Sequence, residues 1–311
     1  MKLIDLHCDT PGELFKSKGS LLCNQHHVDM RKTASFSSYC QMAALFCPAH
    51  LDDDSGFVYV KEMACHFRQE VERTENAVIA TDLKSLAKGF EKGERVFCLT
   101  LEDARILGGD LSRIEALAAL HLWFMTPLWR GESVIGGAHD TDTGLSEFGK
   151  EALARVLENG TVLDVSHASV RSFYDIAALS RAAERPIVAT HSAARALCAH
   201  RRNLDNEQIR MIADMGGIIG INIYPVFLHD SGSADIQALI AHIRHIINVG
   251  GENVIALGTD FDGIASLPCG ISSLADISLL ATYMQRSGYP ASLIDRLFYQ
   301  NGLAFLKTHF R

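Results

Sequence analysis

The sequence predicts an α/β fold, a TIM-like (β/α)8 barrel with extra C-terminal helices. Eight short apolar runs, largely β-branched, recur along the 311 residues. Between them lie amphipathic segments whose apolar residues are spaced near 3.6, which indicates helices. Apolar strands that alternate with helices are typical of a parallel sheet covered on both faces, and eight such units suit a closed barrel. An open doubly wound sheet is the structural alternative.

The individual elements follow from this alternation. The predicted strands cover residues 3–9, 40–47, 96–102, 120–126, 161–166, 186–190, 217–223 and 254–259. Helices are expected over 55–76, 111–119, 147–158, 169–183, 206–215 and 234–249. Glycines such as Gly160 and Gly250 follow the predicted helix ends, where the chain can adopt a left-handed turn. Residues 272–311 predict two or three further helices packed on the barrel, and no linker divides the chain, so residues 1–311 are expected to form one domain.

Composition narrows the range of partners. Hydrophobic residues make up 48% of the chain and charged residues 21%, as in a globular protein with a large core. The formal net charge of −8 argues against a nucleic-acid partner, which would require a clustered basic surface. The eight cysteines contain no CxxC pair and are expected to be reduced. With no leader peptide and no long apolar run visible, we expect a cytoplasmic protein without a membrane partner.

Polar side chains occur where five of the predicted strands end. In a barrel the carboxyl ends of all strands meet at one face, where active sites are found. A single histidine or aspartate at a strand end is usually a cap or a solvated group, but five strands that end this way are better explained by a shared site. The residues concerned are His7, Asp9, Glu102, His167, His191 and Asp260.

This set of three imidazoles and three carboxylates is suited to zinc or a similar divalent ion. Six groups exceed what a single tetrahedral catalytic zinc ion requires. Two metal ions that share a bridging carboxylate, with a hydroxide between them, use the set better. The sequence therefore predicts a binuclear metal centre at the mouth of the barrel.

Several segments, spread over the whole chain, resemble one known family. On these segments the chain resembles the membrane (renal) dipeptidase family of zinc peptidases, within the amidohydrolase superfamily, which implies a TIM-like barrel with a binuclear zinc site. The segments are Asp5-Leu6-His7-Cys8-Asp9, Leu101-Glu102-Asp103, Gly144-Leu145-Ser146-Glu147-Phe148-Gly149, Leu163-Asp164-Val165-Ser166-His167, Thr190-His191-Ser192-Ala193-Ala194-Arg195, Arg201-Arg202-Asn203-Leu204, Gly258-Thr259-Asp260-Phe261-Asp262-Gly263 and Asn301-Gly302-Leu303.

The resemblance also implies a role for each metal-site residue. His7 and Asp9 would hold one zinc ion, and His167 and His191 would hold the other. Glu102 would bridge the two ions. Metals other than zinc are possible with the same ligands.

Three further roles are carried over from the family. Asp260 would be the general acid and base beside the bridging hydroxide. Arg202 would anchor the C-terminal carboxylate of a dipeptide through a bidentate pair, although a surface-loop arginine is the alternative and the neighbouring Arg201 could be confused with it. Tyr224 would line the site and contact the substrate, its alternative being a packed aromatic at the barrel rim.

One position departs from the family pattern. Where well-studied members carry a histidine that polarises the substrate carbonyl, the best alignment places Trp129, as some bacterial relatives also have. An indole N–H can donate one hydrogen bond but cannot become a cation. His139, on the Gly-rich loop that follows, is an alternative donor, although loop histidines are mostly solvated.

The sequence thus predicts a zinc-dependent dipeptidase that tolerates a D-residue at the C-terminal position, with a homodimer as a family expectation. The change at Trp129 motivates a second hypothesis, a lactonase or N-acyl amino acid deacylase on the same metal site. A non-catalytic, metal-stabilised binding protein is the hypothesis from another class. All six metal-site residues are present, which argues against that third hypothesis.

Overall fold

The computed structural model describes residues 1–310. The strands are β1 (Lys2–Cys8), β2 (Ser38–Phe46), β3 (Ala77–Ile79), β4 (Arg95–Glu102), β5 (Phe124–Thr126), β6 (Val162–Asp164), β7 (Ile187–Ser192), β8 (Ile218–Ile221) and β9 (Ile255–Leu257). The α-helices are α1 (Thr10–Ser17), α2 (Asp53–Arg73), α3 (Leu83–Lys92), α4 (Arg113–Ala118), α5 (Glu147–Glu158), α6 (Val170–Ala182), α7 (Asn206–Asp214), α8 (Pro225–Leu228), α9 (Ile236–Gly250), α10 (Ser278–Arg286), α11 (Ala291–Asp295) and α12 (Asn301–His309). Short 3-10 segments η1 (Ala104–Leu107) and η2 (Leu274–Asp276) and a π-helical segment η3 (Arg296–Gln300) complete them.

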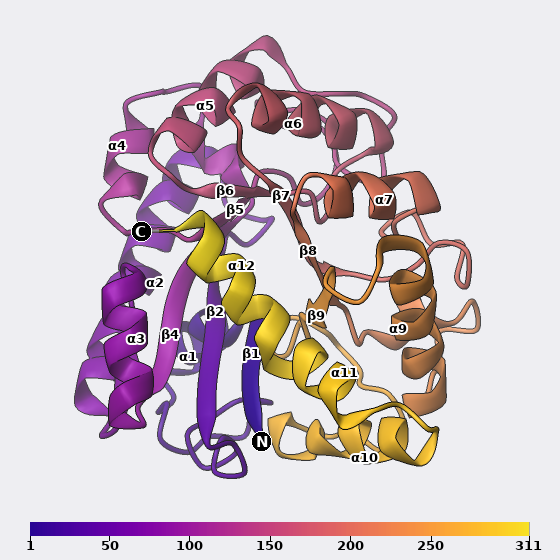
Figure 1. Cartoon of the computed structure of the whole chain (residues 1–311). Coiled ribbons are helices and arrows are strands. Elements are labelled where there is room, and N and C mark those ends of the chain that lie inside the picture. The colour runs from indigo at the N-terminus through magenta and orange to yellow at the C-terminus, as the bar shows by residue number, and fades with distance from the viewer. Residues whose placement is uncertain (311) are drawn as a thin grey trace.

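Eight parallel strands close the predicted barrel. Going round the ring, the order is β1, β2, β4, β5, β6, β7, β8 and β9, and β9 pairs again with β1. The longest pairing joins β2 to β4, where Tyr39–Phe46 lie opposite Arg95–Glu102. β3 lies outside the ring, because it pairs only with the first residues of β4. The barrel and its surrounding helices confirm the predicted fold class (Figure 1).

Several boundaries differ from the sequence prediction. The strands predicted over 120–126, 161–166 and 254–259 are shorter, since β5, β6 and β9 each have three residues. The residues that follow these short strands turn away early and line the mouth of the barrel. The prediction from the sequence did not include α1, β3 and α3, which are short elements without a long apolar run. All eight cysteines are free, as expected.

Side-chain caps explain where many of the helices begin. A carboxylate or hydroxyl oxygen of the residue before the helix accepts a backbone N–H from the first turn, satisfying a donor that would otherwise have no partner. These capping residues are Asp52, Asp82, Ser146, Ser169, Asp205 and Asp235. The caps fix the start of each helix directly after the loop that leaves the barrel mouth.

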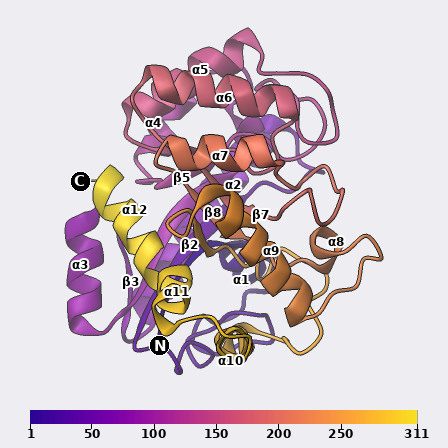
Figure 2. The ribbon, with the colours of Figure 1, turned by 45° about the vertical axis from the view of Figure 1, so that its right-hand side comes forward.

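The C-terminal helices cover the end of the barrel opposite the predicted site. In Figure 1, α12 crosses in front of the ring, and Phe305 and Leu306 pack with buried barrel residues such as Ile4 and Phe124. Figure 2 shows α10 and α9 along the side of the barrel, with α8 beside them. The amide of Asn301 ties α12 to the barrel by donating to the carbonyl oxygens of Glu252 and Ile255 at 2.7 and 2.8 Å. Within residues 1–310, no helix combines the length and apolar character needed to cross a membrane.

Candidate metal centre

The six polar residues predicted at the strand ends lie together at the mouth of the barrel. They reach this face from the carboxyl ends of five strands. His7, Glu102 and His191 belong to β1, β4 and β7, and the other three, Asp9, His167 and Asp260, lie just beyond β1, β6 and β9.

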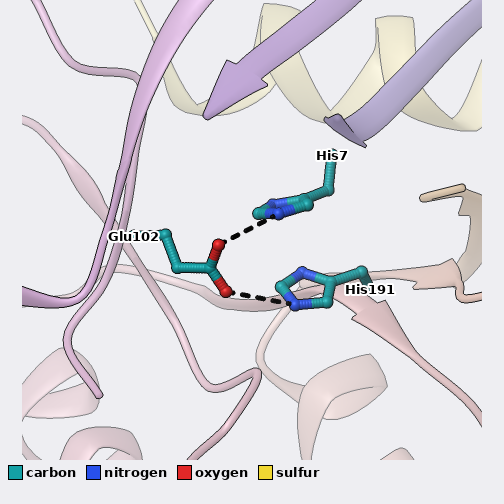
Figure 3. Close-up of side chains that lie close together, drawn as sticks. All are labelled: His7, Glu102 and His191. Atoms are coloured by element: carbon teal, nitrogen blue, oxygen red, sulfur yellow. Dashed lines mark ion pairs between the residues drawn. The ribbon is translucent and has the colours of Figure 1, made fainter. Parts of the chain in front are cut away.

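Glu102 stands between the histidines. Its Oε2 lies 3.4 Å from Nε2 of His7, and its Oε1 lies 2.9 Å from Nε2 of His167 and 3.6 Å from Nε2 of His191. Figure 3 shows one carboxylate oxygen directed at His7 and the other at His191. Burial alone would raise the pKa of Glu102, but His7 and His167 hold it well below its usual range. The two oxygens of this carboxylate thus face different imidazole nitrogens, Oε2 that of His7 and Oε1 those of His167 and His191.

A second group of ligand atoms lies on the other side of His7. Its Nε2 is 3.3 Å from Oδ2 of Asp9 and 3.9 Å from Oδ1 of Asp260. The imidazole is buried, and this Nε2 makes no well-aligned hydrogen bond among residues 1–310, although the carboxylates of Asp9 and Glu102 lie within ion-pair distance. A buried polar atom without a partner is costly, and a cation held with the adjacent carboxylates would satisfy it.

Two outer contacts fix the orientation of His167 and His191. Nδ1 of His167 lies 2.9 Å from the carbonyl oxygen of Trp129, which can only accept, so this nitrogen carries the proton. Nδ1 of His191 lies 2.9 Å from Oγ1 of Thr190, and that hydroxyl donates to Asp164, so Nδ1 is again the donor. Such contacts are the usual support of metal-binding histidines.

The Nε2 atoms of His167 and His191 therefore carry no proton, and their lone pairs point toward each other. They lie 3.0 Å apart. Burial lowers the pKa of His167 and lowers that of His191 well below its usual range, and the charge of Arg202 lowers both further, so both imidazoles are neutral. Neutral nitrogen atoms at this distance repel unless a cation lies beside both, and the donor set fits a divalent metal ion.

Two buried aspartates, which the sequence analysis did not single out, hold the strand ends together. Asp5 on β1 accepts the backbone N–H of Thr259 at 2.9 Å and its hydroxyl at 2.6 Å. Asp164 on β6 accepts the backbone N–H of Thr190 at 3.0 Å. Each threonine directly precedes a site residue, so the aspartates position the backbone of the next strand. In the sequence, the feature that could have identified Asp5 and Asp164 is a carboxylate within an otherwise apolar strand.

In the loop after β9, the backbone lies very close to the carboxylates of Asp9 and Asp260. Asp260 has a φ of 61°, in the left-handed region that costs energy for a residue with a side chain. A Cβ on Gly263 would lie 2.2 Å from Oδ2 of Asp9 and 2.5 Å from Oδ1 of Asp260, so this position requires glycine. Burial, with Asp9 and Glu102 nearby, raises the pKa of Asp260 to about 8. Adjacent metal cations would favour its carboxylate form.

A cavity of about 260 Å³ opens beside these residues. Arg202, Tyr224 and Trp129 line it together with Glu102 and Asp260. The structure thus brings all three residues predicted to contact the substrate to the metal centre. A larger cavity, about 610 Å³, lies at the opposite end of the barrel, away from every predicted ligand.

Arg202 is the buried member of the Arg201-Arg202 pair. Its side chain is 4% exposed, Nη2 donates to the carbonyl oxygen of His191 at 3.3 Å, and Nε has no partner among residues 1–310. Burial lowers its pKa to about 10, so it stays charged at neutral pH. Arg201 is exposed and contacts Asp142 at 3.4 Å. Of the two arginines, Arg202 is therefore the one suited to bind an anion in the cavity, because its guanidinium is buried, charged and has free donors.

Trp129 forms part of the cavity wall. Its ring packs against Phe46, with ring centroids 4.9 Å apart, while its carbonyl oxygen holds His167. Among residues 1–310 no acceptor takes the indole N–H, so it remains available to a substrate. His139 lies behind His167, at 5.7 Å between ring centroids, and is not one of the residues that line this cavity. The structure favours Trp129 over His139 as the residue facing a substrate.

Comparison with known sequences points to one family. The family model described as membrane dipeptidase, peptidase family M19, matches residues 1–309. The uncharacterized protein in the pqqA 5′ region of Klebsiella pneumoniae is 35% identical over 220 residues, which are 67% of this chain and 80% of that protein. An uncharacterized dipeptidase of Schizosaccharomyces pombe is 32% identical over 178 residues, 56% of this chain and 42% of the yeast protein.

Solved structures share the whole fold. The dipeptidase AC, a metallopeptidase of family M19, is 25% identical with a TM-score of 0.92, covering 100% of this chain and 99% of that chain. A metallopeptidase from Rhodobacter sphaeroides, solved with a phosphinate mimic of L-Ala-D-Ala, has the same fold, with 24% identity and a TM-score of 0.91 over 99% of both chains.

Proposed function

The chain belongs to the membrane dipeptidase family, peptidase family M19, and we propose that it hydrolyses the amide bond of dipeptides with the help of two zinc ions. Family membership gives the enzyme class, a metallo-dipeptidase. The metal identity, the number of ions, the mechanism and the substrate stereochemistry are our proposals. The observation that carries them is the position of Glu102, whose two oxygens face different histidines.

We assign the candidate ligands to two sets. His7 and Asp9 form one set, and His167 and His191 form the other, with Glu102 shared between them. When bound, the two ions would lower the pKa of a shared water, supplying hydroxide near neutral pH, and would polarise the substrate carbonyl. The orphaned Nε2 of His7 and the facing lone pairs of His167 and His191 both support this assignment.

Asp260 and Arg202 would then both act on a substrate in the cavity that they line. Oδ1 of Asp260 lies 3.9 Å from Nε2 of His7, which places the carboxylate where it can accept the proton of the attacking water and pass it to the leaving amine. Arg202 would pair with the free C-terminal carboxylate and so orient the scissile carbonyl. Tyr224 lines the same wall.

The volume of the cavity and the position of Arg202 support a dipeptide as the substrate rather than a longer peptide. The cavity of about 260 Å³ holds a small molecule, and Arg202 requires a free carboxylate there. An anchor of this kind recognises the carboxylate and not the configuration of the residue that carries it. We therefore propose that the enzyme tolerates a D-residue at the C-terminal position.

The test is a substrate panel on zinc-reconstituted protein. L,L and L,D dipeptides would be compared with lactones and N-acyl amino acids, and we expect hydrolysis of dipeptides of both configurations. Turnover of lactones with no turnover of any dipeptide would replace this proposal with the lactonase alternative. Protein that takes up no zinc, or that stays inactive on the whole panel once loaded, would favour a non-catalytic role.

A further inference from the structure

Asn222 is a buried residue that contacts the metal centre without lining the cavity. It follows β8 directly, and its side chain is fully buried. Its Oδ1 accepts the backbone N–H of Tyr224 at 2.7 Å, which fixes the orientation of the amide, because a backbone N–H can only donate. The Nδ2 group is therefore turned toward Asp260, and it donates to Oδ2 of that carboxylate at 2.9 Å.

This hydrogen bond gives the two oxygens of Asp260 different surroundings. Oδ2 is held by Asn222, whereas Oδ1 lies 3.9 Å from Nε2 of His7, on the side of the metal ligands. A carboxylate turns easily about its last side-chain bond, since that torsion has broad minima. The Asn222 amide removes this freedom and leaves one oxygen free to take up a proton.

A second branch leads from Asn222 to the substrate anchor. The carbonyl oxygen of His191 accepts Nη2 of Arg202 at 3.3 Å and lies 3.5 Å from Nδ2 of Asn222. Arg202 and Asp260 both line the cavity, whereas Asn222 does not. A continuous set of hydrogen bonds thus joins the residue that would hold the substrate carboxylate to the residue that would move the proton.

We propose that Asn222 is a positioning residue, which holds Asp260 with Oδ1 toward the metal centre and in register with Arg202. This inference rests on the proposed function, because it assigns Asn222 a task in the same hydrolysis. Asn222 is not a candidate metal ligand and does not line the cavity, and its shortest side-chain contact to a candidate catalytic group is the one to Asp260. Its removal should slow the chemical step and spare both metal binding and substrate affinity.

The test is a double-mutant cycle on zinc-loaded protein. Asn222→Ala should lower kcat by about 10²-fold, the usual cost of displacing a catalytic group by about 1 Å, with little change in KM. In the Asp260→Asn background the same substitution should cause almost no further loss, because the group it positions is already gone. Metal content should equal that of the wild type in every variant.

Asn301→Ala is the matched control. Asn301 is another buried asparagine whose amide donates to backbone carbonyls, but it lies on α12 at the other end of the barrel. Its removal should lower the melting temperature and leave kcat near the wild-type value in both backgrounds. Should Asn222→Ala fail to fold, Asn222→Asp keeps the size and the acceptor for Tyr224 while losing the donor to an ionised Asp260.

Two outcomes would overturn the proposal. An equal loss of kcat from Asn222→Ala with and without Asp260 would make the role of Asn222 merely structural. A crystal structure of the zinc-loaded variant in which the Asp260 carboxylate keeps its wild-type orientation would also refute it, whatever the activity. That structural comparison separates this inference from the proposed function, which is tested on the wild-type protein by its zinc uptake and its hydrolysis of dipeptides.

Discussion

Nε2 of His167 and Nε2 of His191 lie 3.0 Å apart, with both protons held on the far side of the rings. The contact joins the loop after β6 to β7, and Oε1 of Glu102 lies beside both nitrogens. An ionised carboxylate oxygen is itself an acceptor, so it adds to the repulsion between the two lone pairs. The arrangement is therefore favourable only with a cation beside it, and several measurable consequences follow.

Removal of the metal should lower both activity and stability. Dialysis against a chelator should abolish hydrolysis and lower the melting temperature, because an ion bound at about a thousand times its Kd contributes about 4 kcal/mol to the free energy of unfolding. Zinc should restore both properties. Glu102→Gln should prevent the recovery of activity by weakening both ligand sets; full recovery in this variant would contradict the bridging role.

Metal binding should also release protons. In the metal-free protein, burial disfavours the His7 imidazolium, but Glu102 and Asp9 outweigh this and raise the pKa of His7 well above its usual range. The imidazole is then protonated at neutral pH, and a metal ion must displace that proton, so affinity should fall as the pH is lowered. Titration calorimetry in buffers of different ionisation enthalpy measures the released protons, and a pH-independent affinity would exclude this coupling.

Arg202 and Arg201 offer a matched pair of substitutions. Arg202→Met should lower kcat/KM by about 10²-fold or more, mainly through KM, since loss of one partner of a buried charge pair costs about 2–5 kcal/mol. Arg201→Met should leave kinetics unchanged, because that side chain is exposed and pairs with Asp142 on the surface. Equal effects from the two variants would show that Arg202 is not the anchor.

Asp260→Asn should remove the proton carrier and keep the shape of the site. We expect kcat to fall by about 10²–10⁴-fold, the contribution typical of general acid–base catalysis, while zinc content stays near that of the wild type. Metal analysis and steady-state kinetics on the same preparation provide the measurement. Wild-type turnover in this variant would rule out the assigned role.

Trp129 can be tested separately because the chain has only two tryptophans. Trp129→Phe keeps the packing against Phe46 and loses the N–H, so kcat/KM should fall by up to about tenfold if one hydrogen bond to the substrate is lost. Trp123 is the control, since its indole donates to the carbonyl oxygen of Ala80 at 2.9 Å in the buried interior. In a Trp123→Phe protein the remaining fluorescence reports on Trp129 alone, and it should change when a dipeptide binds.

The sequence predicted the barrel and the convergence of the six mouth residues, because both depend on strong local signals. Apolar strands have a fixed direction in a barrel, so His7 and Asp260 had to meet once their strands were recognised. The role of Asn222 was not predicted, because the sequence does not show which side chain a polar residue after an apolar run will contact. The choice between Arg201 and Arg202 likewise depended on burial, which two adjacent arginines in a loop do not reveal.

The meeting of β1 with β9 also sets the order of events during synthesis. Asp260 follows His7 and Asp9 in the sequence by nearly the whole length of the barrel, so its strand is synthesised long after theirs. Before β9 has been made, only part of the proposed ligand set is present and the barrel cannot close around an ion. A complete set of the proposed ligands exists only once β9 has joined the barrel, so we expect metal to be bound after that point.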